Sequence, residues 1–231
     1  MRSIRNFQIY SSSLQVERTV NVFLPPGYRT GLDYPALFCA DGQAVEGFSN
    51  SLSKAMEEGR TPPVILVGVH SDPRLRAYEY VDGIENSLFL AHEHFFTDEV
   101  YRWAIAKLDL SFARPACGIF GFSNGGAFAL SMGIRHPEKY GVVIAFSIAG
   151  GAHRIKASEY ARRPAARYYL SAGTREKPFR DTSRAVARIL SKSNVEHVIT
   201  ERYAGHDFDF WNSELCEAIR WAFPEDELGN C

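Results

Sequence analysis

The stretch Ala116-Cys117-Gly118-Ile119-Phe120-Gly121-Phe122-Ser123-Asn124-Gly125-Gly126 decides the fold of this chain. Its first five residues predict a buried strand, and the run from Ala127 to Met132 predicts a helix. Between them the sequence fits the pattern G-x-S-x-G, in which a serine occupies a sharp, strained turn. We expect glycine at 121 and 125 because side chains there would collide with the strand and the helix. Ser123 is therefore a candidate nucleophile, and a glycine-rich turn without chemistry is the alternative.

Strand-like and helical runs alternate along the rest of the chain. Leu14 to Leu24 predicts a strand that ends at the turn signal Pro25-Pro26-Gly27. Short strands that each lead into a helix imply right-handed crossovers and a mostly parallel sheet with helices on both faces. We therefore expect one α/β domain over residues 1–231, of the α/β-hydrolase fold, with an antiparallel N-terminal edge. The further strands fall at 35–40, 64–69, 116–120, 141–147, 167–172 and 195–203, and the helices at 49–58, 93–108, 124–135, 179–192 and 209–222.

Composition narrows the class of protein. A hydrophobic share of 45% and a charged share of 23% are typical of a globular protein. The net charge of -1 gives no electrostatic reason to expect nucleic acid or an anionic membrane as partner. The longest apolar stretches, such as 64–69 and 142–149, are too short to span a bilayer. Residues 1–10 lack the apolar segment of a signal peptide, so we expect a cytoplasmic protein.

The four cysteines predict no chemistry of their own. Cys39 and Cys117 fall in predicted strands, Cys216 falls in the last predicted helix, and Cys231 ends the chain. Without an export signal, reduced and structural cysteines are expected rather than disulfides. None of them stands at a turn near a histidine, which disfavours a thiol nucleophile.

A serine hydroxyl needs a base, and hydrolases of this fold place it after the nucleophile and the acid in chain order. Four histidines follow Ser123. His136 ends the helix after the turn, His153 lies in a polar loop, and His197 falls within a strand-like run. His206 follows the last strand in a loop, at the sheet edge where this fold holds its base, so we predict His206 as the base.

The acid should lie on the loop after the strand at 167–171. That loop is Ala172-Gly173-Thr174-Arg175-Glu176, so Glu176 is the predicted partner of His206. Asp181 is the alternative, although it falls inside the next helix. The oxyanion also needs donors, and the backbone N–H of Asn124 should be one of them. The loop Asp41-Gly42-Gln43 after an earlier strand could supply the second, or could be an ordinary turn.

Three further groups allow both functional and structural interpretations. His92-Glu93-His94 suggests a metal site, but residues two apart on a helix point in different directions, so we expect a solvated helix start. Charged loop residues could bind an anionic substrate, although we favour ion pairs that brace their loops. Aromatic residues could line an acyl or aryl pocket or belong to the core. The charged group comprises Arg74, Arg76, Glu79, Arg175 and Arg180 together with Tyr80, and the aromatic group comprises Phe122, Phe208, Phe210 and Trp211.

With these residues identified, the sequence resembles the putative-esterase family of α/β-hydrolases. That family includes enterochelin esterases, feruloyl and acetylxylan esterases, S-formylglutathione hydrolases and mycolyltransferases. The resemblance implies a triad of Ser123, His206 and Glu176, with the N–H of Gln43 as second oxyanion donor. Asp-Gly-Gln and a glutamate acid are closest to the siderophore-esterase branch. The resemblance covers nearly the whole chain and is carried by 17–28, 41–43, Arg76 with Glu79-Tyr80, 121–126, 136–141, 172–176 and 205–207 with Trp211.

These patterns together predict a serine esterase that forms an acyl-enzyme on Ser123 and needs no metal or organic cofactor. The expected substrate is a small-molecule ester, either a siderophore-type lactone or an aryl or short-acyl ester, contacted by Phe122, Arg76 and Trp211. An acyltransferase or a thioesterase could use the same triad. The alternative from another class is a non-catalytic binding domain of the same fold.

Overall fold

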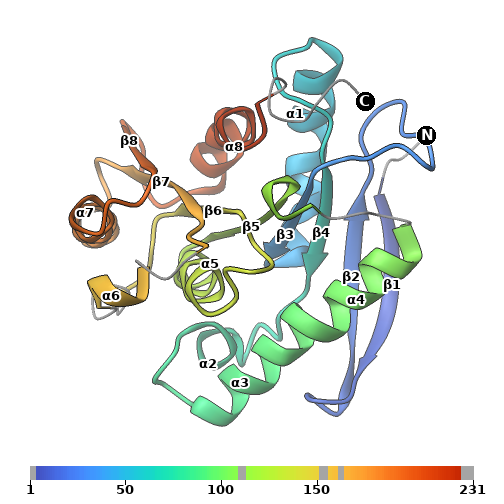
Figure 1. The fold of residues 1–231 in the computed structure, drawn as a ribbon, viewed down its shortest axis with the longest axis horizontal. Coiled ribbons are helices and arrows are strands. Elements are labelled where there is room, and N and C mark those ends of the chain that lie inside the picture. The colour runs from blue at the N-terminus through green and yellow to red at the C-terminus, as the bar shows by residue number, and fades with distance from the viewer. Residues whose placement is uncertain (1–3, 109–112, 151–155, 161–163, 225–231) are drawn as a thin grey trace.

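The computed structural model describes residues 4–108, 113–150, 156–160 and 164–224, and within them eight strands form one sheet (Figure 1). The strand order is β1-β2-β4-β3-β5-β6-β7-β8, and β2 pairs antiparallel with both β1 and β4. The other neighbours are parallel, which confirms the predicted α/β-hydrolase architecture with an antiparallel N-terminal edge. The strands are β1 (Ile4–Ser11), β2 (Val16–Phe23), β3 (Ala36–Ala40), β4 (Ile65–Val69), β5 (Cys117–Phe122), β6 (Val142–Phe146), β7 (Arg167–Gly173) and β8 (His197–Arg202).

The helices connect these strands. The helix predicted at 93–108 is longer in the structure. It begins earlier, at the start of α3, and continues through a π-helical segment into α4. The α-helices are α1 (Val45–Glu57), α2 (Arg76–Tyr80), α3 (Asn86–His94), α4 (Tyr101–Leu108), α5 (Asn124–Arg135), α6 (Ala157–Tyr160), α7 (Lys177–Lys192) and α8 (Phe208–Ala222). The π-helical segment is η2 (Phe95–Val100), and η1 (Gly42–Ala44) and η3 (Arg114–Ala116) are short 3-10 turns.

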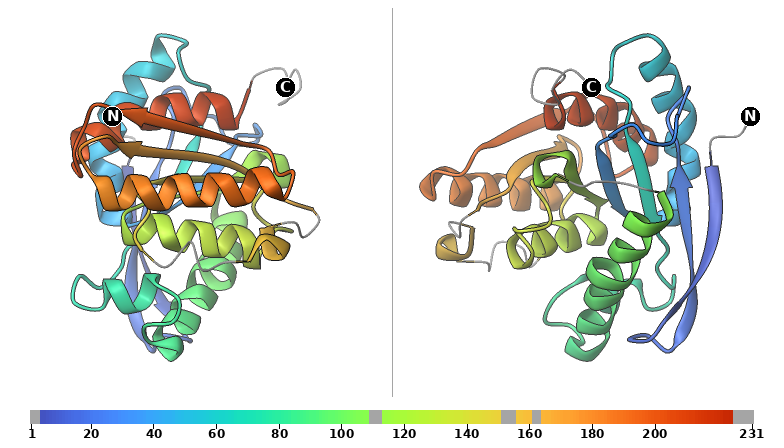
Figure 2. Two further views of the ribbon diagram at one scale, coloured as in Figure 1. Left: turned by 90° about the vertical axis from the view of Figure 1, so that its left-hand side faces the viewer. Right: turned by 45° about the vertical axis from the view of Figure 1, so that its right-hand side comes forward.

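Alternation along the strands divides the interior into two cores. In β3, Leu37 and Cys39 pack with α1 and α8, whereas Phe38 and Ala40 pack with the helices of the other face. Those helices are α2 to α5 and α7, so the sheet is covered on both sides, as Figure 2 shows. The strands of the centre are buried throughout, which explains why they appear in the sequence as continuous apolar runs.

This topology brings several loops to one edge of the sheet. Because β3 and β5 to β8 are parallel, their carboxyl ends lie at the same edge, where ligands bind in open α/β sheets. The loops after these strands carry Gln43, Ser123, Ser147, Glu176 and His206. Within the described residues, no helix is long and apolar enough to cross a membrane.

The described cysteines are free thiols. Cys39 and Cys117 are buried in β3 and β5, and burial raises the pKa of both thiols. A thiol that resists ionisation is a poor nucleophile, so these two cysteines act as small core residues. Cys216 lies on α8 as predicted, and Cys231 lies outside the described residues.

Candidate active site

Ser123 forms the sharp turn between β5 and α5. Its φ of 58° and ψ of −124° are strained for a residue with a side chain, and the surrounding backbone holds them. Its N–H donates to the carbonyl of Phe146 at 3.0 Å, and its own carbonyl accepts from the N–H of Ala149 at 3.1 Å. A Cβ on Gly121 would overlap the carbonyl of Gly125, so glycine is required at 121 as predicted. The half-buried hydroxyl remains open to a partner.

That partner is His206, in the loop after β8. Its Nε2 lies 3.1 Å from Oγ of Ser123, and its Nδ1 lies 2.6 Å from Oε2 of Glu176. The imidazole also stacks on Phe179, with ring centroids 4.0 Å apart. When Nδ1–H donates to the carboxylate, Nε2 is left as the acceptor for the serine proton. The three residues thus form a continuous hydrogen-bonded chain from carboxylate to hydroxyl.

Glu176 is buried at the start of α7 and has further hydrogen-bond partners. Its Oε1 accepts from the hydroxyl of Ser147 and from the N–H of Gly173, each at 2.6 Å. Ser147 in turn accepts from Nε1 of Trp211 at 2.8 Å. An indole N–H can only donate, so the hydroxyl proton of Ser147 is directed to Glu176. Sequence reasoning missed Ser147, because a single serine after a strand belongs to no motif.

Two backbone N–H groups could receive an oxyanion. Asn124 is the first residue of α5, and Gln43 is the second residue of η1. The first N–H groups of a helix have no partner within it, so both are free of helix hydrogen bonds. Asp41 precedes η1 in the left-handed conformation, with φ of 57°, and turns the chain there.

A cavity of about 270 Å³ opens at this edge of the sheet. Phe122 and Trp211 stack within it, with ring centroids 4.3 Å apart. The predicted nucleophile, the predicted base and every residue predicted to contact substrate border this space, whereas Glu176 lies buried behind the imidazole. The lining residues are Asp41, Gln43, Ala44, Arg76, Phe122, Ser123, His206 and Trp211.

The other candidate bases and acids are engaged elsewhere. His136 caps α5 and binds a carboxylate of α3, as expected for a capping or packing residue. His197 bonds to the hydroxyl of Ser191 at 3.1 Å. Asp181 is exposed on α7 and pairs with the lysine one turn before it. His153 lies outside the described residues.

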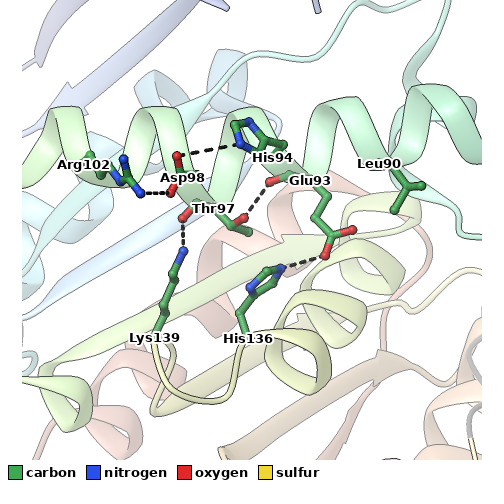
Figure 3. Close-up of a pocket in the computed structure, with 8 residues that line it drawn as sticks. All are labelled: Leu90, Glu93, His94, Thr97, Asp98, Arg102, His136 and Lys139. Atoms are coloured by element: carbon green, nitrogen blue, oxygen red, sulfur yellow. Dashed lines mark hydrogen bonds and ion pairs between the residues drawn. The ribbon is translucent and has the colours of Figure 1, made fainter. Parts of the chain in front are cut away.

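The prediction of a solvated helix start at His92-Glu93-His94 is wrong. The segment ends α3, and its first two residues are buried because α3 packs near α5. Glu93 accepts from His136 and Arg135 of α5, each at 2.7 Å, beside the cavity that Figure 3 shows. Within the described part of the chain, no three His, Cys, Asp or Glu side chains are grouped to hold a metal ion.

The arginines near the site have partners within the protein, which favours bracing over substrate binding. Glu79, wholly buried on α2, pairs with Arg18 of β2 and accepts from the N–H of Asp72 at 3.1 Å. The four arginines considered above pair as follows: Arg74 with Asp72, Arg76 with Asp41, Arg175 with the ring of Tyr203, and Arg180 with the carbonyl of Thr174.

Comparison with known proteins defines the class. The sequence matches the family described as putative esterase over residues 11–222, and the chain belongs to that family. It is therefore an esterase, a hydrolase of carboxylic esters. A curated relative is the uncharacterized protein YbbA of Bacillus subtilis (strain 168), which is 22% identical over 90% of this chain and 94% of its own.

Solved structures share the fold at low identity. A ferulic acid esterase superposes with a TM-score of 0.79 at 17% identity, covering 95% of this chain and 96% of its own. The enterobactin esterase FES from Shigella flexneri, in the presence of 2,3-dihydroxy-N-benzoyl-serine, has a TM-score of 0.82 at 20% identity. That match covers 98% of this chain and 60% of the Shigella chain, so this chain spans less than two thirds of that relative.

Proposed function

We propose that this esterase hydrolyses its substrate through an acyl-enzyme on Ser123, with His206 as base and Glu176 as acid. The hydrogen-bonded chain Glu176–His206–Ser123, with distances of 2.6 and 3.1 Å, carries the proposal. It lies at the carboxyl edge of the sheet and ends in a cavity. The order Ser, acid, His along the chain is that of hydrolases with this fold.

The reaction proceeds in two halves. His206 accepts the proton of Ser123 as Oγ attacks the ester carbonyl, and the N–H groups of Asn124 and Gln43 hold the oxyanion. The alcohol leaves with the proton from His206. Water then attacks the acyl-enzyme by the same steps, and the acid is released while Ser123 recovers its proton. Glu176 keeps the Nδ1 tautomer and stabilises the imidazolium.

The shape of the cavity supports an aryl or short-acyl group as the acid part. Its volume of about 270 Å³ lies below the range of about 300–1,000 Å³ that is usual for ligand pockets. Phe122 and Trp211 offer flat apolar surfaces there. An aryl ring fits beside these residues, and the alcohol part would extend into solvent. Of the similar structures named above, one is a ferulic acid esterase and the other was solved in the presence of 2,3-dihydroxy-N-benzoyl-serine, and both compounds carry an aromatic ring.

Covalent labelling tests the proposal. A fluorophosphonate should label the wild type, and the Ser123→Ala variant should keep its fold and lose the label. Ser191→Ala, which changes the serine that bonds His197, is the matched control and should label normally. Absence of label on the wild type would favour a non-catalytic binding domain, and persistent label on Ser123→Ala would show a different nucleophile.

A substrate panel separates hydrolysis from the related activities. p-Nitrophenyl, feruloyl and trilactone esters should be compared with a thioester, and with an added acceptor alcohol. We expect the aryl ester to give the highest kcat/KM. Faster release with the acceptor, with transfer product formed, would indicate an acyltransferase, and preference for the thioester would indicate a thioesterase.

A further inference from the structure

Arg76 joins the two loops that carry the proposed oxyanion donors. Its Nε and Nη2 each bind a carboxylate oxygen of Asp41 at 2.6 Å, and Nη2 also donates to the carbonyl of Phe122 at 3.3 Å. Asp41 stands two residues before Gln43, and Phe122 stands two residues before Asn124. The guanidinium of Arg76 therefore contacts the backbone that leads to Asn124 and, through Asp41, the loop that carries Gln43.

Asp41, in the loop after β3, is buried and hydrogen-bonded. Its N–H donates to the hydroxyl of Tyr80 at 2.7 Å, and its side chain is 3% exposed. Its Oδ2 would lie 2.9 Å from a Cβ placed on Gly125. The second glycine of the serine turn is thus required by the carboxylate of the neighbouring loop. The end of β3, the loop after it and the start of α5 are therefore closely packed, since the same Cβ would also lie 3.2 Å from Cβ of Ala40.

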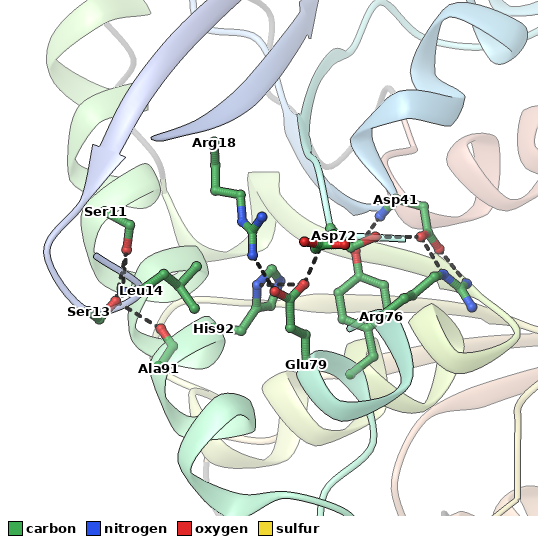
Figure 4. A network of polar contacts seen from close by, with 12 residues as sticks. Ser11, Ser13, Leu14, Arg18, Asp41, Asp72, Arg76, Glu79, Ala91 and His92 are labelled. Carbon is green, nitrogen blue, oxygen red and sulfur yellow. Dashed lines mark hydrogen bonds and ion pairs between the residues drawn. The ribbon is translucent and has the colours of Figure 1, made fainter. Parts of the chain in front are cut away.

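Arg76 is the first residue of α2, and contacts of this helix hold Arg76 in position. Figure 4 shows Arg76 extending toward Asp41, while Glu79 of the same helix points to Arg18 of β2. The guanidinium carbon also lies 5.4 Å from the centre of the Tyr80 ring. A short helix is not rigid alone, but its buried ion pair with β2 fixes it to the sheet. The position of Arg76 is therefore set by the core and not by bound substrate.

We propose that Arg76 is a positioning residue that fixes the separation of the two oxyanion donors, an inference that rests on the proposed function. Donors lower a barrier only when they are held in place before charge develops. Both carboxylate oxygens of Asp41 bind the guanidinium of Arg76, so the charge of Arg76 is neutralised within the protein. Arg76 therefore acts through Gln43 and Asn124, and it does not serve to bind an anionic acyl group.

The experiment uses Arg76→Met in the full chain with a neutral aryl ester. We expect kcat to fall by about 10- to 100-fold, part of the loss seen when one oxyanion donor is removed, while KM changes less than about twofold. The inhibition constant of phenylboronic acid, which forms a tetrahedral adduct on the serine, should rise in parallel with the fall in kcat/KM. Arg74→Met, which changes an exposed arginine paired with Asp72, is the control and should match the wild type.

A second variant separates positioning from folding. Arg76→Met leaves the buried Asp41 charge unpaired and should lower stability, whereas Asp41→Asn/Arg76→Met removes both charges and should regain most of it. We expect the double variant to melt near the wild type and to keep the low kcat. Recovery of kcat with stability would overturn the proposal, as would a raised KM with unchanged kcat. Wild type that resists labelling at Ser123 would instead refute the proposed function.

Discussion

The indole nitrogen of Trp211 and the hydroxyl oxygen of Ser147 are 2.8 Å apart, and this bond directs the serine proton to Glu176. Trp211 also packs edge-on against His206, with ring centroids 4.9 Å apart, and stacks on Phe122. One aromatic residue therefore contacts His206, the residue before Ser123 and the serine that binds Glu176. This arrangement makes Trp211 a support of the proposed triad as well as a wall of the cavity.

Ser147→Ala should lower kcat about tenfold with little change in KM, because the carboxylate of Glu176 loses one of its donors. A hydrogen bond to a charged group contributes about 1.5–3 kcal/mol, and about 1.4 kcal/mol corresponds to a tenfold change in rate. Trp211→Phe keeps a smaller aromatic ring and removes the indole N–H, which reaches Glu176 only through Ser147, so its loss of kcat should be smaller. Steady-state kinetics on an aryl ester measures both effects.

The control for this pair is Trp221→Phe at the other end of α8, where the indole packs on Tyr169. It should leave kcat unchanged. If Trp211→Phe raises KM and leaves kcat intact, Trp211 acts through substrate contact alone. If both Ser147→Ala and Trp211→Phe match the wild type, the hydrogen bonds do not orient Glu176.

Glu176→Gln should lower kcat by roughly 10² to 10⁴, because an amide cannot hold the Nδ1 tautomer of His206 or offset its charge. The substitution preserves volume, so KM and thermal stability should change little. Asp181→Asn, on the exposed face of α7, is the control and should stay within a few-fold of the wild type. A crippled Asp181→Asn variant, or normal rates for both, would show that Glu176 is not the acid.

The positions of the proposed triad residues could be predicted from the sequence because each follows a strand whose carboxyl end meets the others. The strand before Ser123 and the glycines of the turn could be recognised from neighbouring residues alone. The burial of His92 could not be predicted in this way, because it depends on Tyr80 and Phe128, which lie on two other helices. The edge strand β1 was missed because half of its residues are exposed and its apolar residues are interrupted by polar ones. Contacts between distant segments leave no spacing pattern in the chain.

Gly121→Ala should destabilise the fold, because its Cβ would overlap the backbone carbonyl of Gly125. Backbone can yield only by distorting the serine turn, so we expect a loss of about 1–3 kcal/mol in the free energy of unfolding, as for other overpacked sites. Activity should fall as the turn shifts. Gly150→Ala is the control, since nothing lies within 4 Å of its Cβ. Urea unfolding measures both, and equal stabilities would contradict the strained geometry.

His92 should make the protein less stable in mild acid. Its ring is wholly buried among aromatic side chains, and neither nitrogen has a hydrogen-bond partner among the described residues. Burial, with a smaller effect from Arg18, lowers its pKa to about 3. The unfolded chain binds a proton near pH 6.5 and the folded chain does not, so stability falls as pH drops from about 6.5 toward about 3. Glu79, whose Oε2 lies 3.7 Å from Nδ1, is paired with Arg18 and cannot offset this.

His92→Phe should therefore flatten the acid side of the stability curve. The larger ring could cost some stability at every pH, so the measured quantity is the slope of the free energy of unfolding between pH 6.5 and pH 5. Wild type should lose about 1.7 kcal/mol more than the variant over this range, because the slope rises from about 0.7 to about 1.3 kcal/mol per pH unit as the histidine of the unfolded chain becomes protonated. Phe89→Leu, a buried change without a titrating group, should shift the curve by a constant amount. Parallel curves for wild type and His92→Phe would show that His92 binds a proton as readily in the folded chain as in the unfolded chain, and that the aromatic surroundings do not exclude its charge.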